Sequence, residues 1–277
     1  MPALENPPTG LQTSRRNLVR MGAIVASGII AKTTVASAII AKTTPAAAAD
    51  CGTRDPTRCD PQCFLKGTTI RTADGDRKIE DLAVGDVLPT IFGGICPIQW
   101  IGRYRFKRSD PTKAWVNDVL PIRVARSALG PDVPHADLFV TKTHALLIDG
   151  VLVAAGNLIN GTTITRYDAR ELDELEFFHI KLELHDVIYA EGAPCETLLN
   201  VDENAANFAE YLREYGVTTK ETPCAPLLGY GWRRGEMKSC FRSAISPWID
   251  CRQKIDIIRD KLDARGIALL RQSELMS

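Results

Sequence analysis

The sequence predicts an all-β module followed by a C-terminal helical extension. From about Gly67 to Ala190, short runs rich in β-branched and aromatic residues alternate with Gly, Pro and Asp, which is typical of strands joined by tight turns. Beyond residue 200, apolar residues recur every three or four positions, which is the period of an amphipathic helix. A chain of 277 residues is also long enough to bury a sizeable core.

Residues 1–49 have the order of regions found in a secretory signal. Arg15 and Arg16 form a pair typical of twin-arginine export motifs, a weakly apolar run follows, and Ala46–Ala49 offers small residues for cleavage. The apolar run contains Lys32 and several threonines, so it is a poor membrane span. We therefore expect bacterial export to the periplasm or beyond, through the twin-arginine export machinery, with no stable membrane span in the mature form. A disordered basic tail is the alternative.

Charge is divided unevenly along the chain. The first 49 residues hold five basic side chains and one acidic side chain, a net charge of +4, and the remainder carries −4. No cluster of Lys and Arg forms a patch suited to a phosphate backbone, so we expect no nucleic-acid partner.

The β module is expected to follow a short linker at residues 50–62, which is rich in Asp, Pro, Gly and Cys. Within the module, Asp74-Gly75 and Asp149-Gly150 are typical of tight hairpin turns. The expected strands are, in order, Thr68–Thr72, Val87–Phe92, Ile95–Tyr104, Val119–Val124, Leu138–Thr141, Ala145–Ile148, Val151–Ala154, Thr162–Tyr167 and Glu176–Leu184.

The last of these strands has a distinct alternating pattern. Phe178, Ile180, Leu182 and Leu184 alternate with more polar residues. Because successive side chains point to opposite faces of a sheet, this pattern predicts one buried and one solvent-facing side.

Two helices are expected in the tail, at Asn204–Tyr215 and Pro247–Arg265. Ile255, Ile258 and Leu262 fall on one face of the second helix, and Gly266 stands where that helix is expected to end. The intervening segment Thr218–Ser243 is expected to be an irregular connection. The predicted organisation is therefore a signal at 1–49, a linker at 50–62, a β domain at 63–200 and a helical extension at 201–277.

Eight cysteines are many for an ordinary soluble enzyme. Export permits disulfides, and the sequence leaves their connectivity open. No close Cys-x-x-Cys pair and no helical pair of histidines is present, so we expect no metal and no cofactor. His135 has no matched partner in the sequence and is expected to be a loop residue. The candidate disulfide cysteines are Cys51, Cys59, Cys96, Cys195, Cys224, Cys240 and Cys251.

Three segments carry residues suited to chemistry. The first reads Cys-Phe-Leu-Lys-Gly-Thr-Thr-Ile-Arg-Thr from Cys63 and continues as Ile-Glu-Asp-Leu-Ala-Val-Gly-Asp from Ile79. The second is Thr-Lys-Thr-His, from Thr141 to His144, directly after an apolar run. The third runs from Phe177 through His179 and His185 to an Ala-Glu-Gly sequence that begins at Ala190.

These segments, in this order, resemble the splice blocks of the Hint superfamily, which contains inteins and the hedgehog autoprocessing domain. The resemblance covers about residues 63–198. It implies a pseudo-twofold, horseshoe-shaped β module. It also implies that Cys63 is the first residue of the domain, so that its thiol can reach the carbonyl of Gln62 through a five-membered ring.

The resemblance also implies roles for the remaining residues. His144 would donate a proton to the departing nitrogen of Cys63, and Thr141 would hydrogen-bond the scissile amide or its tetrahedral intermediate. His179 occupies a position that is often acidic in inteins, and His185 matches the histidine of the later block; both would assist. The expected activity is an N–S acyl shift and self-cleavage between Gln62 and Cys63, with water or a small nucleophile accepting the thioester.

Full splicing is not expected. Inteins end in His-Asn followed by a nucleophile, whereas Asn200 has neither a preceding histidine nor a following nucleophile.

Several alternatives remain open at this point. Cys63 could be held in a disulfide, and His144 or His185 could be an ordinary core histidine. The chain could be a non-catalytic binding or structural module with the same fold, or a thiol hydrolase that acts on other molecules.

Overall fold

The structure is a computed structural model that describes residues 62–276, except for residues 109, 111, 117–118, 202–204, 217–220, 230–237, 241, 245 and 247–248. All the described residues belong to one unit, residues 46–277. Arg15 and Arg16, the linker before Gln62, and Cys51 and Cys59 lie outside the described residues, so the predictions made for them stay predictions.

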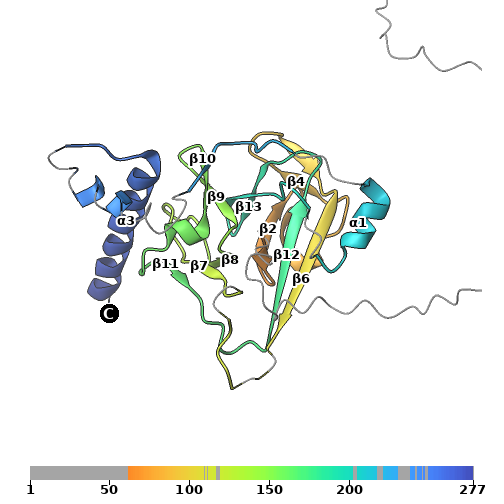
Figure 1. The fold of residues 1–277 in the computed structure, drawn as a ribbon, viewed down its shortest axis with the longest axis horizontal. Helices are drawn as coiled ribbons and strands as arrows, with labels where there is room; N and C mark the ends of the chain where they lie inside the picture. Colours follow the sequence, from red (N-terminus) through yellow and green to blue (C-terminus); the bar gives the residue numbers. More distant parts are fainter. Residues whose placement is uncertain are drawn as a thin grey trace, which may run out of the picture. The chain divides into compact units, whose positions relative to one another are not determined.

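The regular secondary structure of the described chain is mainly β-strand (Figure 1). Its helical elements include η1 (Ile79–Asp81), η2 (Ala155–Leu158), α1 (Phe208–Tyr215) and α3 (Lys254–Met276). Its strands are β1 (Phe64–Leu65), β2 (Thr69–Thr72), β3 (Gly75–Lys78), β4 (Val87–Pro89), β5 (Ile95–Pro97), β6 (Trp100–Lys107), β7 (Ile122–Val124), β8 (Leu138–Val140), β9 (Ala145–Ile148), β10 (Val151–Ala154), β11 (Ile164–Arg166), β12 (Glu174–Lys181), β13 (Val187–Ala190), β14 (Ala193–Glu196) and β15 (Leu227–Leu228).

The order of the strands has a pseudo-twofold relation. Within the described residues, one sheet has the order β11-β7-β8-β1-β12-β6, and the other has β15-β10-β9-β14-β13-β2-β3. Reversing the first order around its central pair, β8-β1, exchanges β6 with β11 and β7 with β12. Reversing the second order around the pair β14-β13 exchanges β2 with β9. Each half therefore gives one strand to the other, because β12 pairs with β1 and β7 pairs with β8. The expectation of an all-β, pseudo-twofold module with a C-terminal helical extension is confirmed.

Two hairpins have two-residue loops in which both residues have positive φ. The β9–β10 loop is Asp149-Gly150, with φ of 50° and 76°, and the β13–β14 loop is Glu191-Gly192, with φ of 46° and 76°. Positive φ at both central positions defines the type I′ turn, whose twist matches that of the flanking strands. The turn predicted at Asp149-Gly150 is confirmed.

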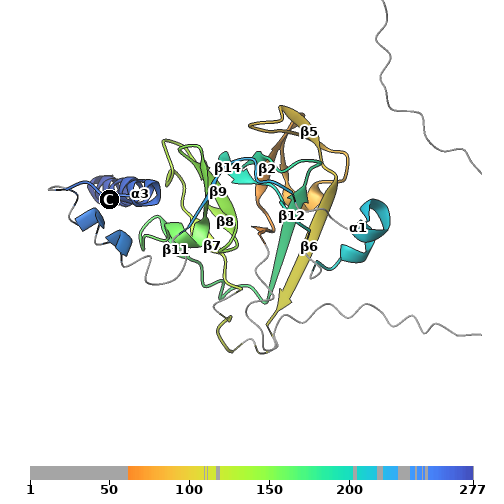
Figure 2. The same cartoon turned by 45° about the horizontal axis from the view of Figure 1, so that its top comes forward.

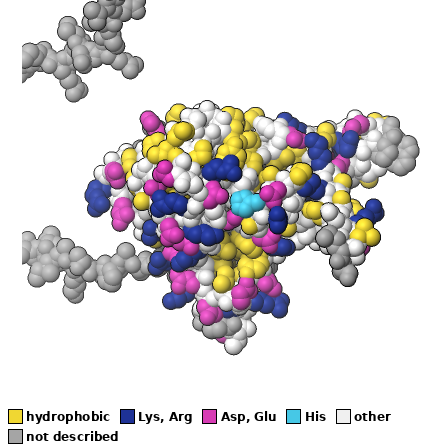
Figure 3. Space-filling view, turned by 180° about the vertical axis from the view of Figure 1, so that it is seen from behind, with side chains coloured by type: hydrophobic (Ala, Val, Ile, Leu, Met, Phe, Trp, Pro, Cys, Tyr) yellow, Lys and Arg dark blue, Asp and Glu magenta, His cyan; other side chains and the backbone are white. Residues whose placement is uncertain are grey.

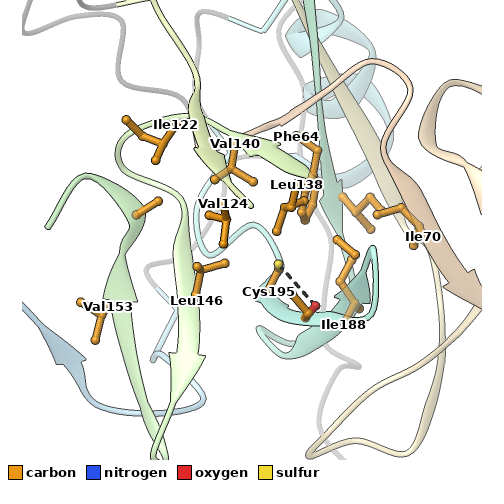
Figure 4. Close-up of a cluster of buried hydrophobic side chains, with 14 of the residues drawn as sticks. Phe64, Ile70, Ile122, Val124, Leu138, Val140, Leu146, Val153, Ile188 and Cys195 are labelled. Atoms are coloured by element: carbon orange, nitrogen blue, oxygen red, sulfur yellow. Dashed lines mark hydrogen bonds between the residues drawn. The ribbon is translucent and has the colours of Figure 1, made fainter. Parts of the chain in front are cut away.

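The main core cluster lies between the sheets and contains apolar side chains from both halves. Figure 4 shows Phe64, Val140, Leu146 and Ile188 converging, with the thiol of Cys195 donating to the carbonyl of Ala193. The other residues of the cluster that are labelled there are Ile70, Ile122, Val124, Leu138 and Val153. Burial of this continuous apolar surface provides the main stabilisation of the module.

β12 is buried on both faces, and the predicted solvent-facing side is therefore wrong. Phe178 and Ile180 belong to the main core cluster, while Leu175 and Phe177 pack on the opposite side in a second cluster. β12 pairs with β1 at one edge and with β6 at the other, and Figures 1 and 2 show it beside β6. Both faces are buried from Phe177 to Lys181, and only the start of the strand, at Glu174, is exposed. The strand ends at Lys181, and Leu184 beyond it is 74% exposed.

α3 packs on the β module through Ile255, Ile258 and Leu262, as the spacing predicts. The predicted end of this helix at Gly266 is wrong, because the helix continues to Met276. Gly266 is buried, and a Cβ at this position would collide with Oγ1 of Thr162. The glycine thus permits a close approach of helix and loop. None of the helices in the described part of the chain is both long and apolar enough to cross a membrane.

Part of the segment expected to be an irregular connection adds a strand to the module. Residues 221–229, which we call the strap, include β15, and β15 pairs in parallel with β10. At its other end, Glu221 accepts a 2.7 Å hydrogen bond from Nζ of the buried Lys181. The strap therefore joins the C-terminal extension to β10 and β12, which are strands of the two different sheets.

Candidate functional site

The register of β1 determines where Cys63 lies. Phe64 pairs with Val140 of β8 on one side and with Phe178 of β12 on the other. Because both pairings are antiparallel, the residue before Phe64 is placed beside the residues that follow Val140 and Phe178. Cys63 is thus flanked by Thr141 and His179, which lie far from it in the sequence.

Thr141 holds the backbone of Cys63 on both sides. The amide of Cys63 donates to Oγ1 of Thr141 at 2.8 Å, and the amide of Thr141 donates to the carbonyl of Cys63 at 2.9 Å. The amide of Cys63 belongs to the Gln62–Cys63 peptide, so the threonine hydroxyl contacts the bond that cleavage would break. The Cys63 side chain is buried, and its Sγ lies 3.9 Å from Nδ1 of His179.

His144 is buried beside the same peptide. Its ring lies 4.2 Å from the ring of Phe64 and stacks on His179 with centroids 5.5 Å apart. Burial lowers the pKa of His144 to about 4, and the charge of Glu196 and the carbonyl oxygens of Gln62 and Glu196 act in the opposite direction. The carbonyl of Gln62 that a Cys63 thiolate would attack is therefore close enough to influence this imidazole.

His179 lies on β12, fully buried, at the position expected to be acidic in inteins. Burial, followed by the neighbouring His144 and His185, holds its pKa well below 6.5. It is therefore neutral at physiological pH, and its Nδ1 faces the thiol of Cys63. The ring can accept the thiol proton, a role that a carboxylate would otherwise take.

His185 lies in a separate part of the site. The backbone amide of Cys224 in the strap donates to its Nδ1 at 3.0 Å, and its Nε2 lies 3.5 Å from Oε2 of Glu196. Because Nδ1 accepts this bond, the proton of the neutral imidazole is on Nε2, which faces the carboxylate. The structure brings Cys63, Thr141, His144 and His179 together and links His185 to them through Glu196.

Glu196 is a site residue that sequence reasoning missed. Its side chain is 1% exposed, and its Oε1 accepts a 2.7 Å hydrogen bond from the amide of Ala145, next to His144. A signal was present in the sequence, because Glu196 ends an otherwise apolar strand, Ala193–Glu196. A carboxylate within a buried strand is rarely accidental, since an ionised group is costly to bury without partners.

The buried histidines have unused hydrogen-bonding capacity. Among the described residues, seven buried side-chain atoms have no hydrogen-bond partner, and four of these are ring nitrogens of His144, His179 and His185. Native proteins satisfy most buried polar atoms, so a concentration of unsatisfied ones is typical of a reactive site.

The other sequence predictions have mixed outcomes. Cys96, Cys195, Cys224, Cys240 and Cys251 are thiols, so the disulfide prediction finds no support among these five. The described residues contain no group of three or more His, Cys, Asp or Glu that could hold a metal ion. The prediction that His135 is a loop residue is confirmed, and the structure adds a contact that the sequence did not show, because its Nε2 lies 3.3 Å from Oε2 of Glu191.

Comparisons with known proteins agree with the three sequence blocks. A family model described as "Hint domain" matches residues 62–202. Similar solved structures include the gp41-1 intein, at 15% identity over 49% of this chain and 98% of that chain, with a TM-score of 0.35. The DnaB intein from Synechocystis sp. PCC 6803 is 14% identical over 50% and 99%, with a TM-score of 0.35. The bacterial intein-like domain from Clostridium thermocellum is 15% identical over 50% and 98%, with a TM-score of 0.36. A search of curated proteins found no match.

Proposed function

This chain belongs to the Hint domain family, a family of intein-like autoprocessing domains, and from this premise we propose that it cleaves its own backbone between Gln62 and Cys63. The observation that carries the proposal is the placement of the Gln62–Cys63 peptide. Thr141 holds its amide, His144 lies close to its carbonyl, and His179 faces the thiol.

The proposed reaction has two steps. Sγ of Cys63 gives up its proton to His179 and attacks the carbonyl carbon of Gln62, forming a C–S bond. The C–N bond then breaks as the nitrogen of Cys63 receives a proton from His144. The products are a thioester and the free amine of Cys63. Water or a small nucleophile next adds to the thioester, releases the segment ending at Gln62 and restores the thiol.

The depressed pKa of His144 suits a proton donor in a slow reaction. Only a small fraction of the imidazole is protonated at neutral pH, but that fraction is a strong acid because burial destabilises the charged form. A domain that cuts itself turns over once, so a small reactive fraction is sufficient.

The burial of Cys63 favours attack on its own chain. The side chain is 0% exposed, so the thiol is not in contact with an added ester or thioester in this conformation. The Gln62 carbonyl is already adjacent to it in the sequence. This observation places self-cleavage ahead of a thiol hydrolase acting on other molecules.

The proposal covers cleavage but not splicing, and it includes export of the chain. Asn200 is not preceded by histidine and is not followed by a nucleophile, so the chain lacks the residues that complete splicing. Arg15, Arg16 and the following apolar run support export through the twin-arginine machinery.

The test is the intact mass of the purified full chain, with and without dithiothreitol. We expect loss of residues 1–62, a new N-terminus at Cys63 and faster loss with added thiol, because thiol intercepts the thioester. Cys63→Ala should abolish the cleavage, whereas the matched variant Cys96→Ala, which removes a thiol outside the site, should not.

A chain that stays intact in every condition would reject self-cleavage. If Cys63 is then found in a disulfide in the unreduced sample, the binding-module alternative is favoured.

A further inference from the structure

Two carboxylates occupy matching positions across the pseudo-twofold axis. Ile70 pairs with Ala190 where β2 meets β13, and Leu146 pairs with Cys195 where β9 meets β14. The residues after Ala190 and Cys195 are Glu191 and Glu196.

The contacts of the two carboxylates also match. Glu191 accepts the amide of Thr69 at 2.6 Å, just as Glu196 accepts the amide of Ala145 at 2.7 Å. Each then faces the Nε2 of one histidine: His135 at 3.3 Å and His185 at 3.5 Å.

Their surroundings differ. The side chain of His135 is 37% exposed, and Figure 3 shows one histidine at the surface among acidic and basic side chains. His185 and Glu196 are buried, and His144 lies next to Ala145, whose amide Glu196 accepts. One carboxylate therefore ties strands together near water, and the other places a negative charge beside the site.

The ionisable groups around Glu196 come from every element packed against it. His185 approaches from the segment before β13, His144 from the turn before β9, and Cys195 lies on β14 itself. In the strap, burial, then the charge of Asp186 and then that of Glu196 raise the pKa of the Cys224 thiol to about 11. Across the site, His179 of β12 stacks on His144, and Lys181 on the same strand adds a positive charge.

Within this group, Glu196 is the buried carboxylate that opposes the effect of burial on His144. The imidazoles of His179 and His185 have no negative charge to offer, and His185 directs a proton toward Glu196. Without this anion, protonation of His144 would place an uncompensated positive charge in the protein interior.

We propose that Glu196 is a positioning residue that acts through His144, by keeping a negative charge in the buried site so that His144 can carry the proton for cleavage. The expected effect of Glu196 on the cleavage rate rests on the proposed function, whereas its expected effect on the pKa of His144 does not. Glu191 is its symmetry-related counterpart without that role.

Two measurements test the proposal. The first is the rate of self-cleavage against pH for the full chain with Glu196→Gln, Glu196→Asp or Glu191→Gln. We expect Glu196→Gln to slow cleavage near neutral pH by up to about tenfold for each unit by which the pKa of His144 falls, because the smaller protonated fraction is partly offset by its greater acid strength. The difference in rate between the Glu196→Gln variant and the parent should shrink as the pH is lowered. Dividing the rate of the variant by that of the parent cancels the pH dependence of the Cys63 thiol, which both chains share. Glu196→Asp keeps the charge and should keep the shape of the profile, and Glu191→Gln should follow the parent.

The second measurement is an NMR titration of His144 in the uncleavable Cys63→Ala chain, with and without Glu196→Gln. We expect the variant to lower the pKa of His144. A deficit that is the same at every pH, or a His144 titration that Glu196→Gln does not move, overturns the proposal. If the parent chain does not cleave at all, self-cleavage fails, and the titration alone decides the role of Glu196.

Discussion

Burial of an imidazole changes how a folded chain responds to acid. The pKa of His144 is lowered from 6.5 to about 4, so the native state binds fewer protons at this residue than the unfolded state does. Native stability is therefore lost as the pH falls from about 6.5 toward 4, and it is fully present above that window. His179, whose pKa is also lowered, acts in the same direction.

We predict that His144→Gln reduces this loss. In the Cys63→Ala background, lowering the pH through this window should cost the parent about 3 kcal/mol more unfolding free energy than it costs the His144→Gln variant. Urea unfolding at several pH values measures the difference. Parallel curves for the parent and the variant would contradict the assigned cause, and His179→Gln should flatten the curve in the same sense.

The sequence predicted the site residues that belong to a motif. It did not predict the residues whose role depends on partners far away in the sequence. Cys63, Thr141, His144 and His179 are brought together as the blocks predict. Glu196 was missed because its importance depends on the amide of Ala145 and the imidazole of His185, and no local pattern shows those contacts. The contact of His135 with Glu191 was missed for the same reason.

At the scale of elements, Gly266 shows how tertiary packing overrides a local signal. A glycine near the end of a helical pattern predicts a stop, yet α3 continues because the glycine allows contact with Thr162. The prediction from turn chemistry at Asp149-Gly150 succeeded because positive φ at both positions is a local requirement.

We predict that Gly266→Ala destabilises the protein. In an exposed helix this change gains about 1 kcal/mol, but here the added methyl group meets Thr162 and should cost about 1–3 kcal/mol instead. Urea midpoints of the single variant and of Gly266→Ala with Thr162→Ala measure the effect. The double variant should recover part of the loss, and a more stable single variant would show that the contact yields easily.

At the scale of the whole molecule, the strap ties the C-terminal extension to the β module through a buried ion pair. Nζ of Lys181, a fully buried side chain of β12, donates to Glu221 at 2.7 Å and to the carbonyl of Leu182 at 2.8 Å. The strap also supplies the amide that orients His185. No sequence pattern predicted this tie, since Lys181 and Glu221 are 40 residues apart in the chain.

We predict an asymmetric response to breaking this pair. Glu221→Ala leaves the buried ammonium of Lys181 without a counter-charge and should cost about 3–5 kcal/mol. Lys181→Met, which keeps the length of the side chain and removes the charge, should cost less, because Glu221 is partly exposed. Unfolding midpoints of both variants and of the double variant measure the coupling, and equal losses in the two single variants would argue against it.

The exchange of strands between the halves has a consequence for timing during synthesis. Cys63 leaves the ribosome early, but Thr141 follows 78 residues later and His179 follows 116 residues later. Under the proposed function, a nascent chain that ends before these two residues cannot cut itself, because Thr141 and His179 are needed to hold the scissile amide and to accept the thiol proton. Chains that stall or are truncated before β12 should therefore keep their N-terminal segment, and only a fully made and folded domain would release it.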